Sequence, residues 1–179
     1  LAVITANPDQ SKHIETAVVR VLGFSIDFVN LRSETYSEES RIPTIQYGSP
    51  AEDAERRDFT VNALFYNLDT RQVEDFTNKG LEDLKAGIIR TPVDPLITFR
   101  DDPLRVLRAI RFSSRYAFSF DDTLVRAARH KDIHSAMTHK VSRERVWKEL
   151  KPMICNEANP AVRPLLAIAS LFYFGIFGI

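Results

Sequence analysis

The chain has 179 residues, of which 44% are hydrophobic and 27% charged, so it suits one globular domain, or one and a half, with a buried core. Lysine and arginine together number 24, as do aspartate and glutamate, and the formal net charge is zero. Overall charge therefore excludes a uniformly basic nucleic-acid-binding protein, and such a partner would need a local patch like the basic one at residues 100–115.

The cysteine content indicates an intracellular protein, and the start of the chain indicates a fragment. Cys155 is the only cysteine, which excludes an internal disulfide framework, fits a reducing compartment and suggests a buried, unreactive thiol. Four scattered histidines do not form a zinc signature. The chain starts at Leu1 with no secretory signal or transit peptide. We expect a fragment of a soluble intracellular protein, in the cytoplasm, mitochondrion or nucleus.

The first third of the chain predicts strands and then a loop. The β-branched run at residues 17–21 predicts a strand, Gly23 a turn, and residues 25–32 a second, antiparallel strand. Asp27 is conspicuous in the second strand, because a carboxylate among apolar residues either faces solvent or lines a site. Residues 33–55 contain prolines, a glycine and many acids, and are expected to be a connecting loop.

Short elements are expected next. Residues 60–66 suit either a short helix or a strand. A strand, a short helix and a second strand are expected over residues 72–76, 80–84 and 88–91. Prolines then mark a linker, and the composition changes from strand-like to helical. We place a domain boundary near residue 92, between domains of residues 1–92 and 93–179.

The region 101–115 predicts an amphipathic helix. Asp101 and Asp102 suit its N-cap and first turn, and Pro103 suits a position that needs no N–H donor. The apolar stripe of this helix consists of Leu104, Val106, Leu107 and Ile110, and its basic side of Arg105, Arg108, Arg111 and Arg115. Taken alone, such a basic side is typical of a solvated, salt-bridged surface.

Two further helices and an uncharged tail are expected after this helix. The first runs from the Asp121-Asp122 pair to about His130, and the second follows Ser142 as N-cap. The core stripe of the second is expected to consist of Val146, Leu150, Met153 and Ile154. Residues 165–179 carry no charge, are too short for a confident membrane span, and are expected to form an exposed apolar tail.

Six short sequence motifs follow one another along this chain. They are S-K-H-x-E-T-A (11–17), D-F-V-N-L-R-S-E (27–34), R-R-D-x-T-x-N-A-L (56–64), D-F-x-x-x-G-x-x-D-L (75–84), D-D-x-x-R (101–105) and S-x-E-R-x-x-x-E-L (142–150). This series resembles the motifs of class II tRNA nucleotidyltransferases, the CCA-adding enzymes, and its wording is closest to the eukaryotic branch. The fourth string is expected to act as a structural hinge.

The resemblance implies an α+β fold and a reaction. It implies a nucleotidyltransferase-type head with a mixed β-sheet, of which the N-terminal part is missing, followed by an α-helical neck. The implied reaction is template-independent addition of CCA to tRNA 3′ ends from CTP and ATP, with Mg²⁺ as cofactor. The implied partners are tRNA, CTP and ATP, with no membrane and no obligate protein partner.

The resemblance also implies roles for particular residues. Asp102 and Arg105 would read the base, because a carboxylate accepts and a guanidinium donates hydrogen bonds. Arg57 and Asp58 would contact the phosphates and the ribose, and Asp27 would be a catalytic carboxylate and metal ligand. The full nucleotide-binding set is Arg56, Arg57, Asp58, Asn62, Asp101, Asp102, Arg105 and Arg108. The RNA-binding candidates are Lys12, His13, Arg143 and Arg145, with helix stabilisation as the favoured alternative for the last two.

One family motif has no counterpart in the sequence. A G-G-x-x-R-D segment with a downstream D-x-D pair supplies the main metal ligands in this family, and neither string occurs here. Asp27 alone cannot hold two Mg²⁺ ions, since each needs several oxygen ligands. We therefore predict little or no nucleotidyl transfer by this chain alone. Two alternatives remain: a bacterial-type poly(A) polymerase, and a non-catalytic nucleotide- or RNA-binding fragment.

Overall fold

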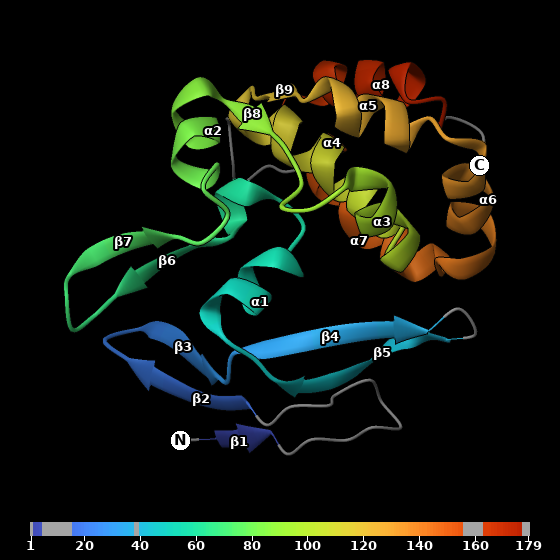
Figure 1. Cartoon of the computed structure of the whole chain (residues 1–179). Coiled ribbons are helices and arrows are strands. Elements are labelled where there is room, and N and C mark those ends of the chain that lie inside the picture. The colour runs from blue at the N-terminus through green and yellow to red at the C-terminus, as the bar shows by residue number, and fades with distance from the viewer. Residues whose placement is uncertain (1, 5–15, 38–39, 156–162, 177–179) are drawn as a thin grey trace. The chain divides into compact units, whose positions relative to one another are not determined.

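The computed structural model describes residues 2–4, 16–37, 40–155 and 163–176 (Figure 1). The chain divides into two compact units, Leu1–Asp53 and Ala54–Ile179, which we call the N-terminal and C-terminal units. The α+β class is confirmed, and the strands of the described residues form small separate sheets. No helix among the described residues is long and apolar enough to cross a membrane.

The N-terminal unit contains a three-stranded antiparallel sheet. It consists of β1 (Ala2–Ile4), β2 (Thr16–Val21) and β3 (Phe24–Val29), with β2 in the middle. Leu22 and Gly23 both have positive φ, 49° and 85°, as a two-residue hairpin turn requires. The predicted hairpin is confirmed, although its second strand ends at Val29 rather than Arg32.

The prediction of a loop over residues 33–55 is wrong. This segment contains a second antiparallel hairpin, β4 (Arg32–Ser37) and β5 (Ser40–Tyr47), and the helix α1 (Pro50–Glu55). Strand pairing needs only backbone groups, so polar and proline-containing segments can form it. Ser49 and Glu52 form a capping box: the Ser49 N–H donates to Glu52 Oε2 at 2.7 Å and the Glu52 N–H to Ser49 Oγ at 3.3 Å. That S-x-x-E signal was present in the sequence.

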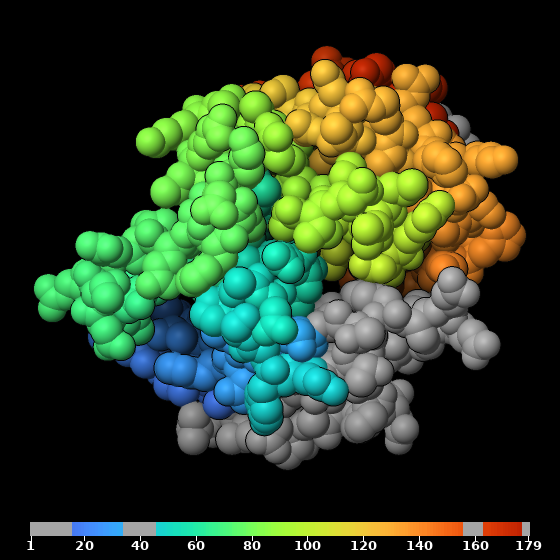
Figure 2. Space-filling model, in the orientation of Figure 1, coloured from blue at the N-terminus to red at the C-terminus, as the bar shows by residue number. Residues whose placement is uncertain are grey.

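The C-terminal unit begins with a 3₁₀ turn and a hairpin. The turn η2 (Thr60–Asn62) leads into β6 (Leu64–Asn67), so residues 60–66 contain both of the expected alternatives. The antiparallel partner of β6 is β7 (Gln72–Asp75), and this hairpin projects from the body of the unit (Figure 1 and Figure 2). Next come α2 (Gly80–Ala86) and β8 (Ile88–Ile89), close to their predicted positions.

Helices make up the rest of this unit. They are α3 (Pro95–Asp101), α4 (Leu104–Tyr116), α5 (Asp122–Ala128), α6 (Lys131–Lys140), α7 (Arg143–Ile154) and α8 (Pro164–Tyr173), and the short strand β9 (Ser119–Phe120) pairs in parallel with β8. The Asp121 and Ser142 side chains cap α5 and α7 as predicted. Helix α4 is central, because α3, α7 and α8 all pack against it. Its predicted apolar stripe is buried.

The start of α4 differs from the prediction. Asp94 caps α3 by accepting from the N–H groups of Leu96 and Ile97, so a separate helix occupies the expected linker and ends at Asp101. Asp102 instead lies between the two helices, and its Oδ1 accepts from the Leu104 N–H at 3.2 Å. The boundary near residue 92 stays a prediction, and residues on both sides of it belong to the C-terminal unit.

The C-terminal expectations need correction. Residues 164–173 form α8, and Ala167, Leu171 and Phe174 belong to the buried core rather than to an exposed tail. An uncharged segment can pack on one face of a helix while its other face remains exposed. Cys155 is exposed rather than buried, since it follows the last residue of α7. Met153 is fully buried as predicted, but Ile154 is exposed.

Candidate functional site

The C-terminal unit contains a pocket of about 570 Å³ with a strongly charged lining. Four segments contribute to it: residues 56–62 (the turn before η2 and η2 itself), the loop before α4, α4 and α7. The lining residues are Arg56, Arg57, Asp58, Asn62, Asp102, Leu104, Arg105, Arg108 and Arg145. Five arginines and two aspartates leave an excess of positive charge, which favours an anionic ligand. We call this the arginine pocket.

The segment from Arg56 to Asn62 is held in shape by its own polar groups. Asp58 is buried, and its Oδ1 accepts from the Phe59 N–H at 2.9 Å and from Asn62 Nδ2 at 3.1 Å. Arg57 Nη1 donates to the Asn62 carbonyl oxygen at 2.8 Å, and its guanidinium lies 4.6 Å from the centre of the Phe65 ring. These contacts bend the chain so that Arg57 and Asp58 both line the pocket.

A buried network behind this segment fixes η2 to the rest of the unit. Thr60 Oγ1 donates to Asp83 Oδ2 at 2.7 Å, and Arg90 Nε donates to Asp83 Oδ1 at 3.2 Å. The Thr60 N–H also donates to the Arg90 carbonyl oxygen at 2.9 Å. Asp83 is almost fully buried, and a buried carboxylate needs such partners. Asp83 of α2 and Arg90, just after β8, thus hold η2 in place.

Arg108 and Asp58 join α4 to this segment. Arg108 Nε and Nη2 both donate to Asp58 Oδ2, at 2.8 and 2.5 Å. Burial of the Arg108 guanidinium opposes its charge, but the carboxylates of Asp58, Glu149 and Asp102 outweigh that effect and raise the pKa of Arg108 above its ordinary value. Next to this pair, the Phe59 ring meets the Phe112 ring edge-on, with centroids 5.6 Å apart.

Glu149 is a functional candidate that was not assigned from the sequence. It is buried, and its Oε2 accepts from Arg111 Nε at 2.6 Å while its Oε1 lies 3.6 Å from Arg108 Nη1. The carboxylates of Asp58 and Glu149 therefore flank Arg108 from two different elements. The available signal was the second glutamate of the string at 142–150, which sits at helical spacing from Arg145.

The two expected base-reading residues are each fixed by a partner. Arg105 Nη2 donates to the Arg56 carbonyl oxygen at 2.6 Å. Asp102 Oδ2 accepts from Arg145 Nη2 at 2.8 Å. Both residues line the arginine pocket, so a carboxylate acceptor and a guanidinium donor stand in one charged cavity.

Most of the predicted nucleotide-binding residues meet in this pocket. Asp101 is the exception, because it ends α3 and does not line the cavity. Of the RNA-binding candidates, Lys12 and His13 lie outside the described residues. Arg145 lines the arginine pocket, whereas Arg143 lines a different one.

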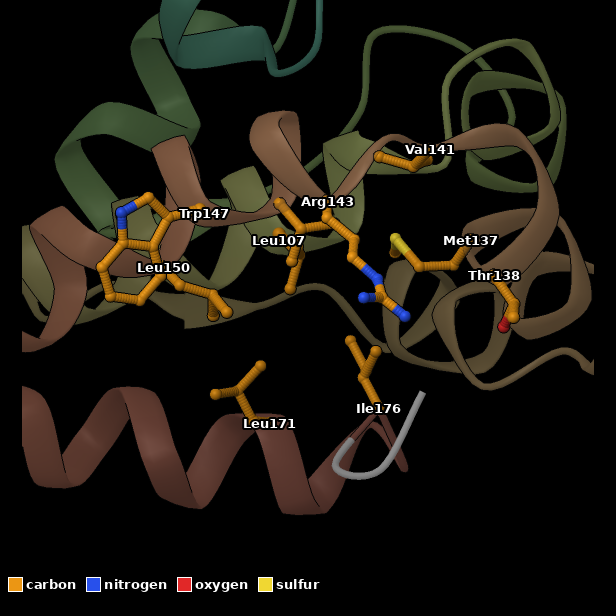
Figure 3. Close-up of a pocket in the computed structure, with 10 residues that line it drawn as sticks. Leu107, Met137, Thr138, Val141, Arg143, Trp147, Leu150, Leu171 and Ile176 are labelled. Carbon is orange, nitrogen blue, oxygen red and sulfur yellow. The ribbon is translucent and has the colours of Figure 1, made fainter.

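That second pocket has a volume of about 450 Å³ and lies between α4, α6, α7 and the end of α8 (Figure 3). Its lining is largely apolar, with Leu107 and Trp147 on one side and Leu171 and Ile176 on the other. The Arg143 guanidinium extends into it (Figure 3). Arg143 and Arg145 are two residues apart on one helix, so they point to different sides.

Asp27 lies in the N-terminal unit, on β3, with an exposed side chain. The described residues include no group of three or more His, Cys, Asp or Glu side chains that could hold a metal ion. Asp27 alone does not fit a two-ion magnesium site, which needs several oxygen ligands for each ion.

Comparison with known proteins matches this arrangement. Residues 2–90 match the family model of the poly(A) polymerase head domain. A nucleotidyltransferase of Purpureocillium lilacinum is 54% identical over 159 residues, which are 89% of this chain and 26% of that protein. The mitochondrial CCA tRNA nucleotidyltransferase of Saccharomyces cerevisiae is 50% identical over 165 residues, 92% of this chain and 29% of that protein. The chain spans less than a third of the length of these two relatives.

A solved structure extends the match to the fold. The Bacillus stearothermophilus CCA-adding enzyme in complex with CTP has a TM-score of 0.73 at 26% identity, over 90% of this chain and 36% of that one. The fold is thus that of the head and neck of a nucleotidyltransferase. The chain belongs to the family of tRNA nucleotidyltransferases and poly(A) polymerases, which are nucleotide-transferring enzymes.

Proposed function

We propose that the protein of which this chain is part adds CCA to the 3′ end of tRNA from CTP and ATP, and that this chain supplies its nucleotide-recognition site. The observation that carries the proposal is the arginine pocket. Residues from two strings about fifty positions apart, Arg57-Asp58 and Asp102 to Arg108, line one cavity. Such convergence is not expected of a solvated charge run.

The chemistry of the lining suits a nucleoside triphosphate. The arginine excess favours the phosphates, and Arg57 is the candidate for a forked contact to their oxygens. Cytosine and adenine both carry an exocyclic amino group that donates a hydrogen bond, which the Asp102 carboxylate can accept. Arg105 can keep its bond to the Arg56 carbonyl and still donate to a ring nitrogen or carbonyl of the base, because a guanidinium has five N–H donors.

The hydrogen bonds of Asp58 favour a different role from the ribose contact that its motif predicts. Its two oxygens already accept four N–H groups, from Phe59, Asn62 and twice from Arg108, and a carboxylate has about four acceptor positions. We infer that Asp58 mainly positions Arg108 and the turn before η2. A ribose hydroxyl would have to replace one of these donors.

Mg²⁺ is proposed as the cofactor of the whole protein. A divalent ion would stabilise the charge on the leaving pyrophosphate and activate the attacking 3′-hydroxyl. Asp27 can supply one carboxylate to such a site, and further carboxylates would be needed beside it. Lys12 and His13 remain candidates for RNA contacts.

The test is CTP binding to the purified 179-residue chain, followed by a transfer assay on a tRNA that ends before its CCA. We expect saturable CTP binding that weakens at least tenfold in Asp102→Ala and Arg105→Ala. It should be unchanged in Arg126→Ala, which removes an exposed arginine of α5 outside the pocket. Absence of CTP and ATP binding by the parent chain would overturn the proposed recognition site.

The transfer assay separates the alternatives. We expect little or no addition by this chain alone, with a full-length relative as positive control. Addition of a single CCA and nothing further would show that this chain can hold the Mg²⁺ ions without the D-x-D pair. Long tails made from ATP alone would favour a poly(A) polymerase. Nucleotide binding without transfer, even after a segment with the family's G-G-x-x-R-D and D-x-D strings is added to the assay, would favour a non-catalytic fragment.

A further inference from the structure

The Asp102 carboxylate is held at both of its oxygens. Its Oδ1 accepts from the Leu104 N–H at 3.2 Å, and its Oδ2 accepts from Arg145 Nη2 at 2.8 Å. The first bond comes from the backbone of the helix that Asp102 precedes, and the second from a side chain of α7. Two donors on different elements fix the rotation of a carboxylate, and about half of its acceptor positions are left.

Arg145 is itself anchored against α4. It lies in the first turn of α7, where its N–H donates to the Ser142 cap, and one turn later Glu149 bonds Arg111 of α4. Helix α7 packs against α4, so α7 cannot slide along α4 without breaking the bond between Glu149 and Arg111. The Arg145 side chain lines the arginine pocket beside Asp102. Its position thus follows from the packing of two helices.

We propose that Arg145 is a positioning residue that sets nucleobase selectivity by orienting the Asp102 carboxylate, rather than an RNA contact. The inference rests on the proposed function, because it needs Asp102 to meet the base. With the carboxylate fixed, an amino group of cytosine or adenine donates to it. Uracil presents a carbonyl oxygen at the corresponding place and is rejected, because two acceptors then face each other.

The ratio of CTP to UTP affinity tests this role. We expect the parent 179-residue chain to prefer CTP, and Arg145→Ala to lower the CTP/UTP ratio about tenfold, the effect of one charge-assisted hydrogen bond. Arg145→Lys should fall between them, since it keeps the charge but loses the planar fork. Loss of a positive charge weakens both triphosphates alike, so it cancels in the ratio. The matched control is Lys148→Ala, on the same helix and outside the pocket.

A double-mutant cycle shows whether Arg145 acts through Asp102. In an Asp102→Asn background, Arg145→Ala should change the CTP/UTP ratio less than twofold. A full tenfold change in that background would overturn the proposal, as would an Arg145→Ala ratio equal to that of the parent. Weaker binding of a tRNA lacking CCA with an unchanged ratio would assign Arg145 to RNA instead. If the parent binds no CTP at all, the proposed function fails and this inference fails with it.

Discussion

Asp58 is the residue on which the arginine pocket most depends. It is only 7% exposed, yet it is a carboxylate, and it bonds the backbone, an asparagine and Arg108. Removal of the Asp58 carboxylate would leave the half-buried Arg108 guanidinium without this opposite charge. Asp58 therefore both stabilises the fold and positions Arg108.

We expect Asp58→Asn to lower the free energy of unfolding by about 2 kcal/mol, because it removes a charge-assisted pair while keeping the size of the side chain. Chemical denaturation of the purified chain measures this. Asp69→Asn, in the exposed turn between β6 and β7, should cost less than about 0.5 kcal/mol. Equal losses in both variants would contradict the structural role of Asp58.

The pKa of Asp121 links the stability of the fold to pH. Burial disfavours its charged form, but hydrogen bonds from the Thr123 hydroxyl and N–H and the charge of Arg90 outweigh that effect and lower the pKa of Asp121. Because the pKa of Asp121 is lower in the folded state, its charged form contributes to the free energy of unfolding above the unfolded-state pKa of about 3.9. This contribution is lost as the pH falls through the folded-state pKa.

Asp121→Asn should therefore be less stable than the parent at pH 7, and should lose less stability between about pH 5 and pH 2. Thermal unfolding of both proteins across this range is the measurement. A difference between the two proteins that stays constant from pH 7 to pH 2 would show that the pKa of Asp121 is not linked to folding.

At the scale of elements, α4 and α7 form the frame of the site. Glu149 of α7 bonds Arg111 and faces Arg108, and Arg145 of α7 bonds Asp102. These contacts connect the residue before α4 and the middle of α4 with two successive turns of α7. The relative position of the two helices thus determines where the pocket side chains stand.

Glu149→Gln tests this frame. We expect a loss of about 2–3 kcal/mol in the free energy of unfolding, because Arg111 and Arg108 would keep their charges in a half-buried site without the carboxylate. Glu144→Gln is the control: this exposed residue pairs with Lys148 on the same helix, and its loss should be much smaller. A Glu149→Gln variant as stable as Glu144→Gln would contradict the frame.

At the scale of the whole molecule, α8 completes the core of the C-terminal unit. Phe174, just after α8, is fully buried, and its ring lies 4.8 Å from that of Phe120, centroid to centroid. Ala167 and Leu171 of the same segment are buried with it, and α8 packs against both α4 and α7. Segments some fifty residues apart in sequence therefore share one core.

We expect Phe174→Ala to cost about 3–4 kcal/mol, because it removes a large buried ring and leaves a cavity. Leu165→Ala, at a position 83% exposed, should change stability by less than about 0.5 kcal/mol. Calorimetry on the two variants and the parent gives both values. A small effect of Phe174→Ala would indicate that this segment is an exposed tail, as expected from the sequence, and not part of the core.

Much of this organisation follows from local sequence signals. The β2–β3 hairpin, the caps at Asp121 and Ser142 and the apolar stripe of α4 were predicted, because turn chemistry, capping and periodicity act over a few residues. The β4–β5 hairpin was missed, since strand pairing uses backbone groups that leave little trace in composition. The capping box at Ser49 was a signal left unused.

The site divides in the same way. The sequence by itself indicated the family of enzymes and most of the charged side chains that line the pocket, because motif strings preserve residue type and order; it also included Asp101, which does not line the pocket, and assigned Arg145 to RNA. Only the tertiary structure decided that Asp58 holds Arg108, that Arg145 holds Asp102 and that Arg143 faces another pocket. A partner forty or fifty residues away is chosen by helix packing and burial, and no local pattern records that choice.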